Sequence, residues 1–391
     1  MIIYNKDWLD NLRIHETAEN WFRKSFITPS QLTGIKQEFF SGYKHTNLFV
    51  RIGLFLFTFI LATSAIGLVM LFMSAAIDSF GVIFLVFAGI LWFVLEQFVK
   101  EKKYFRNGID DMLLYISLGY FISGISVIVA QVTDTIDLNG VLIVAVIGLP
   151  VLVFAAVRFA DAFVSLVAYV CLLLIIFILV HKTGTTGKAL MPFAIMVVSF
   201  LVYVFVVKFK KEAAKIYWRH CLSTIETASL ITLYAAGNYF VVRESSALLF
   251  NLSLQPGEDI PLAIVFYALT LAIPVAYIIT GIRNKDRIPL RTGIILAALS
   301  VLTYRYYYHF MNAEAAMIIA GVFLVAVSWL VIKKLQTPWN EITFKDTGEE
   351  PSVIEAESLL IAQTFGQQAT KKNDVEFGGG SFGGGGAGGN F

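Results

Sequence analysis

The sequence predicts an all-α integral membrane protein, a polytopic bundle of about ten transmembrane helices. Three observations support this prediction. Hydrophobic residues make up 57% of the 391 residues and charged residues only 15%, whereas a soluble domain carries roughly 25% charged residues to keep its surface in water. The apolar residues are gathered in long runs. The basic residues are concentrated in alternate segments between those runs.

The apolar runs define the predicted spans. A helix crosses the hydrocarbon core of about 30 Å with about 20 apolar residues. Two segments of this kind are interrupted by charge, 220–242 by Glu226 and 288–310 by Arg291 and Arg305. The runs without a charged residue are 52–77, 79–95, 112–133, 138–157, 162–180, 189–207, 260–282 and 315–332.

The basic residues decide the count and the orientation, because Lys and Arg gather in cytoplasmic loops. With ten spans and an internal N-terminus, all but four of the 30 Lys and Arg residues lie on the cytoplasmic side. Leaving out either interrupted segment would move further basic residues to the outer side. We therefore expect a multi-pass protein of the bacterial cytoplasmic (inner) membrane with both termini in the cytoplasm. The four exceptions are Lys182, Lys188, Arg243 and Arg305.

Three regions follow from this topology. Residues 1–47 are expected to form a cytoplasmic amphipathic helical hairpin, and residues 48–333 the transmembrane domain. Residues 334–391 form a cytoplasmic tail. The tail ends in a glycine-rich sequence that cannot bury enough surface to offset its ordering entropy, so we expect disorder from about residue 370.

A helix start divides the N-terminal region into two helices. Thr28 can cap free amide groups, Pro29 suits the first helical position, and Gln31 can complete a capping box. Apolar residues recur at helical spacing on both sides of this point. We therefore expect residues 4–42 to form two helices that turn at 27–29, with Trp21 and Phe22 packed rather than solvated.

The segment from Glu19 to Leu32, ENWFRKSFITPSQL, resembles the opening of a family of bacterial predicted membrane proteins of unknown function. Those proteins begin with a tryptophan-containing helix, an isoleucine-threonine turn and a second helix, which many spans follow. The glycine-rich end at 377–391 is similar to the tails of membrane proteins that carry a TPM-type domain, although this chain lacks such a domain. The resemblance implies a fold and a location, and it implies no activity.

An internal repeat is a second hypothesis about the transmembrane domain. Spans two to five, 79–180, can be aligned with spans six to nine, 189–310, and Pro150 and Pro274 then fall at matching places. Four helices per unit preserve the orientation, so the repeat would be parallel. Both prolines are candidate helix kinks, which would suit a transport site built on broken helices.

Glu226 is the first candidate site residue, because a carboxylate at membrane depth costs about 2.5–3.5 kcal/mol or more unless it faces a cavity or a partner. It lines a cytoplasm-facing vestibule or relays protons, or it pairs with Arg158 or with a lysine at a helix end, or it is simply protonated. Arg158 and Asp161 are three residues apart between two spans. Local ion pairing is the simpler interpretation of those two residues.

A second candidate group lies near the predicted outer surface. Arg305 and His309 are four residues apart and share one helical face, and Glu314 precedes the next span. This group could bind an anion, or it could form a structural network between two spans. Both interpretations remain open.

The sequence predicts no catalytic, cofactor-binding or metal site. It contains no hydrolase triad, Walker loop, dinucleotide fingerprint or zinc signature. Cys171 and Cys221 fall in separate apolar runs, which argues against a disulfide. The net charge of +2 gives no reason to expect nucleic acid as a partner.

Three functional hypotheses follow. The leading one is an inner-membrane scaffold or regulator that is embedded in the lipid bilayer and acts on a protein partner through its hairpin or tail. The alternative is a secondary transporter or permease for a small solute or lipid, which Glu226, the two prolines and the repeat would favour. A membrane-embedded enzyme is the third, and the absence of catalytic motifs makes it the weakest.

Overall fold

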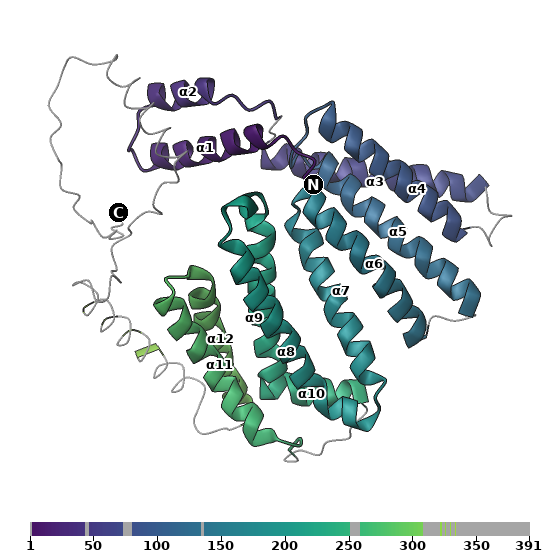
Figure 1. The fold of residues 1–391 in the computed structure, drawn as a ribbon, viewed down its shortest axis with the longest axis vertical. Helices are drawn as coiled ribbons and strands as arrows, with labels where there is room; N and C mark the ends of the chain where they lie inside the picture. Colours follow the sequence, from purple (N-terminus) through teal and green to yellow (C-terminus); the bar gives the residue numbers. More distant parts are fainter. Residues whose placement is uncertain are drawn as a thin grey trace, which may run out of the picture. The chain divides into compact units, whose positions relative to one another are not determined.

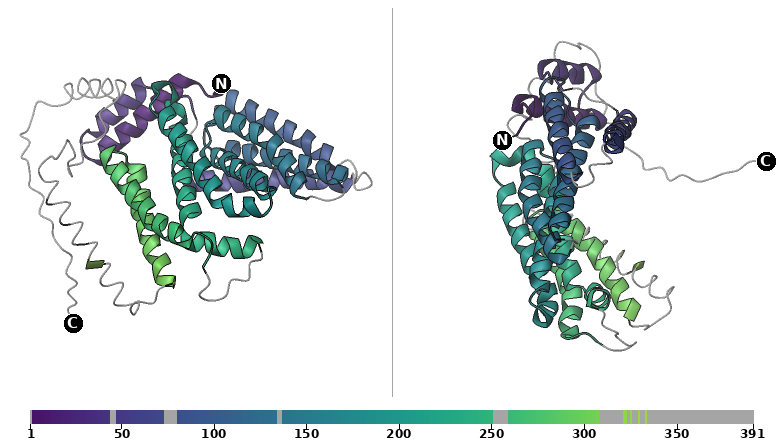
Figure 2. Two further views of the ribbon diagram at one scale, coloured as in Figure 1. Left: turned by 60° about the horizontal axis from the view of Figure 1, so that its bottom comes forward. Right: turned by 90° about the vertical axis from the view of Figure 1, so that its right-hand side faces the viewer.

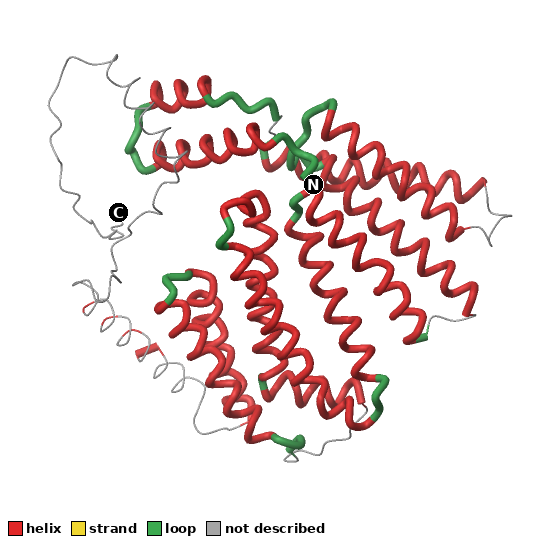
Figure 3. Tube along the Cα trace, in the orientation of Figure 1, coloured by secondary structure: helices red, strands yellow, loops and turns green. Residues whose placement is uncertain are grey.

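The computed structural model describes residues 2–43, 47–72, 80–133, 137–250 and 259–307, with single positions between 321 and 333. Throughout this part of the chain every regular element is a helix (Figure 3), so the prediction of an all-α fold is confirmed. Most of the predicted span 315–332 lies outside the described residues. His309, Glu314 and the C-terminal tail lie outside them too.

Figure 1 labels the helices in chain order. Their bounds are α1 Lys6–Arg23, α2 Pro29–Glu38, α3 Leu48–Phe72, α4 Phe80–Lys100, α5 Ile109–Thr133, α6 Leu138–Phe159, α7 Ala162–His181, α8 Thr185–Lys210, η2 Ala213–Trp218 (a 3₁₀ helix), α9 Arg219–Gly237, α10 Tyr239–Phe250, α11 Ala263–Arg283 and α12 Arg287–Tyr307.

The stretch Asp7–Ser41 belongs to a compact unit separate from the helices that follow it. It contains α1 and α2, and its buried core consists of Ile14, Ala18, Ile27 and Ile35. Trp21 packs against this core. We call this stretch the hairpin.

The turn of the hairpin has the predicted capping box. The Thr28 hydroxyl accepts a hydrogen bond from the Gln31 amide at 3.3 Å, and the Gln31 side chain accepts one from the Thr28 amide at 2.7 Å. The predicted packing of Phe22 is wrong, since 40% of this residue is exposed. Ile14, Ala18 and Trp21 follow the helical repeat that faces α2, and Phe22 is one step of about 100° around the helix from Trp21.

The other compact unit carries eight helices that are long and apolar enough to cross a membrane. In the most apolar part of each, between 17% and 44% of the residues are buried against protein. Large apolar side chains make up much of their exposed surface, as at Phe49 and Ile264, each 85% exposed. These faces suit lipid tails, so contact with a bilayer accounts for them. The spanning helices are α3, α4, α5, α6, α7, α8, α11 and α12.

Neighbours in the chain form the closest helix pairs, which are α4–α5, α6–α7, α8–α9 and α11–α12 (Figures 1 and 2). Glycines permit the close contact between α4 and α5. A Cβ atom at Gly81 would lie 2.6 Å from the Ile128 side chain, and one at Gly124 would lie 2.9 Å from the Gly81 carbonyl oxygen. Small residues at such an interface allow two backbones to approach closely, which favours helix association in lipid.

The segment 220–242, expected as one span, contains two helices, α9 and α10, that meet at Asn238. The Asn238 side chain explains the break. Its oxygen accepts a hydrogen bond from the Val241 amide at 3.2 Å, and its nitrogen donates to the hydroxyls of Tyr234 and Thr303 at 2.8 and 3.1 Å. Asn238 is only 2% exposed, so the interruption lies inside the protein, where these side chains satisfy it.

The two prolines that were candidate kinks lie inside helices, Pro150 in α6 and Pro274 in α11, and both helices continue past them. The pairs α4–α5 and α6–α7 correspond in order to α8–α9 and α11–α12, and Pro150 and Pro274 are in the third long helix of each set. Pro192 in α8 has no counterpart in α4. The repeat remains a prediction, and α10 has no counterpart in the first set.

Candidate functional site

Glu226 on α9 is fully buried, with 0% of the residue exposed. One oxygen, Oε2, accepts a hydrogen bond from the Lys210 ammonium group at 2.9 Å. Lys210 is the last residue of α8 and is a lysine at a helix end, one of the two kinds of partner that the sequence suggested. Among the described residues the other oxygen, Oε1, has no hydrogen-bond partner. The pair therefore leaves one acceptor of a buried carboxylate unsatisfied.

Arg158 does not form an ion pair with Glu226. Its guanidinium group binds Glu96 on α4 through two nitrogens, at 2.7 and 2.8 Å from Oε1. Glu96 also accepts hydrogen bonds from Lys100 at 2.9 Å and from the Trp92 indole at 3.1 Å. Arg158 thus ties the end of α6 to α4. The sequence did not single out Glu96, which directly follows the apolar run 79–95.

The expected ion pair between Arg158 and Asp161 is wrong. The helix α6 ends at Phe159, and Ala160 takes a left-handed conformation with φ 49°, so Arg158 and Asp161 are not on one helical face. Asp161 instead begins α7. Its carboxylate accepts hydrogen bonds from the Val164 amide at 2.8 Å and from the Tyr115 hydroxyl at 3.1 Å. Burial raises the pKa of Asp161 in spite of these bonds.

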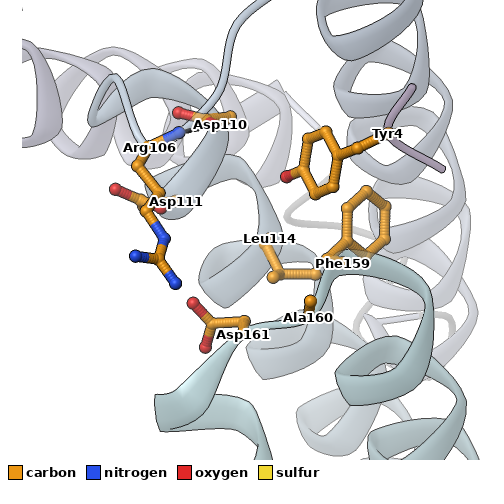
Figure 4. A pocket seen from close by; sticks show the side chains of 8 residues that line it. All are labelled: Tyr4, Arg106, Asp110, Asp111, Leu114, Phe159, Ala160 and Asp161. Carbon is orange, nitrogen blue, oxygen red and sulfur yellow. Dashed lines mark hydrogen bonds between the residues drawn. The ribbon is translucent and has the colours of Figure 1, made fainter. Parts of the chain in front are cut away.

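A small polar pocket lies beside this junction (Figure 4). Its volume is about 10 Å³, roughly the space that one water molecule requires. Three carboxylates line it, those of Asp110, Asp111 and Asp161. Asp110 accepts hydrogen bonds from the amides of Arg106 and Asn107 at 2.7 and 2.8 Å, and Asp111 binds the Arg51 guanidinium group at 2.6 Å. The lining residues are Tyr4, Arg106, Asp110, Asp111, Leu114, Phe159, Ala160 and Asp161.

The first residues of the chain are bound at this pocket. The Ile3 amide donates to the Arg158 carbonyl oxygen at 3.0 Å, and the Asn5 amide donates to the Tyr43 hydroxyl at 2.7 Å. Between them the Tyr4 ring contacts Phe105 and Tyr43, with ring centres 4.9 and 6.0 Å away. Burial and then the charge of Asp110 raise the pKa of Tyr4 well above its usual value. We call residues 2–6 the N-terminal segment.

A row of buried polar residues follows α9 beyond Glu226. Ser229 is fully buried. Thr232 and Ser199 are joined by a hydrogen bond of 3.0 Å, and the Tyr169 hydroxyl binds both. The row ends at the helix break. Such a row is unusual in lipid-facing helices, and α9 is not among the eight spanning helices.

Arg305 lies in the last turn of α12, and its Nη1 atom is buried without a hydrogen bond to the described residues. His309 and Glu314, which were expected beside it, lie outside those residues. The structure therefore brings together Glu226 with Lys210 and Arg158 with Glu96. It places Asp161 in a third location, at the polar pocket.

These features define a class. The chain is a helical protein with several helices able to span a membrane, and Glu226 and Arg158 are each bound to a side chain of opposite charge. Among the described residues no group of three or more His, Cys, Asp or Glu could hold a metal ion. Comparison of the chain with protein-family models, with curated proteins and with solved structures gives no match.

Proposed function

We propose that this protein is a scaffold or regulator of the bacterial cytoplasmic membrane, with ten spans and both termini in the cytoplasm. The observation that carries the proposal is the hairpin, which has its own buried core around Ile14 and Ile35 and its own capping box. A module with a buried core of its own is well suited to bind a partner.

The local pairing of charge supports the same proposal. Glu226 is bound by Lys210, and Arg158 is bound by Glu96. The described pocket at Asp110 has space for about one water molecule and includes neither Glu226 nor Arg305. A solute pathway would need a larger polar cavity at those residues.

The connections of the hairpin support a regulatory role. Asn5 and Tyr43, which lie just outside its two ends, are hydrogen-bonded to each other. The N-terminal segment also binds the end of α6 through Ile3. A change in the hairpin would therefore act on the N-terminal segment, and through it on the junction between α6 and α7.

A secondary transporter is the second candidate, and one observation favours it. The break between α9 and α10 at Asn238 is buried, and polar side chains line α9 from Glu226 to that break. In transporters, discontinuous helices form substrate and ion sites near the centre of the membrane. A membrane-embedded enzyme remains the third hypothesis.

A complementation experiment separates the two candidates. A strain that lacks the gene would be complemented with Ile35→Asp, which places a charge in the hairpin core, and with Glu226→Gln, which keeps the shape of the carboxylate and removes its charge. A scaffold or regulator requires that Glu226→Gln restores the phenotype and that Ile35→Asp does not. The reverse result, with both variants present at normal levels in the membrane, would reject this proposal in favour of transport.

A further inference from the structure

The turn of the hairpin exposes two aromatic residues, one before and one after a pair of basic residues. The sequence there is Phe22-Arg23-Lys24-Ser25-Phe26. Phe26 is 72% exposed and Phe22 is 40% exposed, and the three residues between them are exposed as well. We call these five residues the hairpin tip.

The backbone of the hairpin tip is held in one conformation. The amides of Lys24, Ser25 and Phe26 donate hydrogen bonds of 3.1, 2.9 and 2.9 Å to the carbonyl oxygens of Asn20, Phe22 and Trp21. The next residue, Ile27, enters the hairpin core, which leaves Phe26 directed away from it. The exposed rings are therefore presented by an ordered turn, and desolvating them needs little further ordering of the backbone.

The charge of the hairpin tip has one sign. From Asn20 to Gln31 the sequence contains Arg23 and Lys24 and no Asp or Glu. The nearest acidic residue, Glu19, is bound to Lys36 at 2.7 Å. Basic residues next to exposed aromatic rings are the combination that binds an anionic lipid surface, where the rings enter the boundary between headgroups and acyl chains.

The tether of the hairpin keeps it near a bilayer. Only residues 42–47 separate the hairpin from α3, the first spanning helix. Six residues extend over at most about 20 Å, and the 18 residues of α1 measure about 27 Å. The hairpin tip is thus confined to within a few tens of ångströms of the membrane that holds α3, which gives it a high effective concentration at that surface.

We propose that the hairpin tip binds the anionic lipid surface of the membrane that anchors the chain. Phe22 and Phe26 enter the lipid boundary, and Arg23 and Lys24 bind lipid phosphate groups. This inference rests on the proposed function because it places the hairpin on the cytoplasmic side, where anionic lipids would serve as the signal that positions the module.

The test uses the full chain in lipid nanodiscs. A fluorescent NBD label is attached at Ser25→Cys after Cys171 and Cys221 are replaced by Ala. Its exposure to water is measured by acrylamide quenching in phosphatidylcholine alone and in phosphatidylcholine with phosphatidylglycerol. We expect quenching to fall several-fold in the anionic lipid. Each basic residue contributes about fivefold to surface binding, so R23S/K24S should abolish the difference.

Two further variants separate the rings of the hairpin tip from exposed aromatic residues in general. F22S/F26S should abolish the protection of the label. F40S is the matched control, because Phe40 is 67% exposed on the same hairpin but outside the tip, and it should preserve that protection. Circular dichroism of each variant checks that helix content is unchanged.

Three results would overturn the inference. Equal quenching in both lipids would show that the tip does not respond to anionic lipid. If F40S loses as much protection as F22S/F26S, then exposed aromatic residues in general, and not those of the hairpin tip, account for the protection. Protection of the label in native membranes, but in neither of the two nanodisc lipids, would assign the hairpin tip to a protein partner. None of these results bears on the Ile35→Asp complementation, so the proposed function would stand or fall separately.

Discussion

Lys210 and Glu226 form an ion pair across the interface of α8 and α9, with 2.9 Å between Nζ and Oε2. The carboxylate is fully buried, and the lysine side chain is 21% exposed. The arrangement places the more costly charge where Lys210 is its ion-pair partner among the described residues.

The first prediction concerns this ion pair. Replacing Lys210 by Met leaves the Glu226 charge buried without its partner and should lower the free energy of unfolding by about 3–5 kcal/mol. The double variant K210M/E226L removes both charges and should be close to the wild type. Unfolding in mixed micelles with increasing SDS measures both. If the double variant is as unstable as K210M, packing and not charge accounts for the loss.

The second prediction concerns the capping box at Thr28. Replacing Thr28 by Ala removes the acceptor of the Gln31 amide, and a lost cap typically costs about 1 kcal/mol. Hydrogen exchange of the α2 amides should become about fivefold faster. Thr33→Ala is the control, because the Thr33 hydroxyl bonds only to the Pro29 carbonyl oxygen within the helix. Similar exchange in both variants would contradict the role of the cap.

The third prediction concerns topology and follows from the distribution of basic residues. Reporter fusions at Thr135 and Gly257 should be periplasmic. Fusions at Asn107, Asn284 and Thr347 should be cytoplasmic. A periplasmic signal from the Thr347 fusion would reject ten spans.

The fourth prediction concerns the N-terminal segment. Tyr4 is buried between Phe105 and Tyr43, so Tyr4→Ala should free this segment at a cost of about 3 kcal/mol, as for other buried aromatic residues. Tyr4→Phe keeps the ring and should preserve the segment. Hydrogen exchange of the Ile3 and Asn5 amides gives the measurement. Fast exchange in both variants would show that the hydroxyl, and not the ring, holds the segment.

The periodic and local features of the fold were predictable from sequence. Seven of the long apolar runs coincide with α3 to α8 and α11, and the interrupted segment 288–310 coincides with α12, because burial in lipid selects composition over a whole helix. The capping box at Thr28 was predictable because all of its contacts lie within four residues.

The site contacts were not predictable, because they join residues far apart in the chain. Glu96 and Arg158 are 62 residues apart, and their spacing contains no sign of the pair. The position of Asn238 within an apolar segment gave no sign that its side chain would cap α10 and bind Thr303, 65 residues away. Phe22 was misplaced because periodicity alone does not show how wide a buried helical face is.

The end of α6 has a mechanical consequence. Carbonyl groups at the end of a helix lack partners in their own helix, and two of them here bind other segments. The Arg158 carbonyl accepts from Ile3 at 3.0 Å, and the Val157 carbonyl accepts from the Trp218 indole at 2.7 Å. A change in the tilt of α6, such as thinning of the bilayer would favour, would pull on the start of the chain and on η2 at once. Membrane tension would thereby reach two points of the chain that lie more than 200 residues apart.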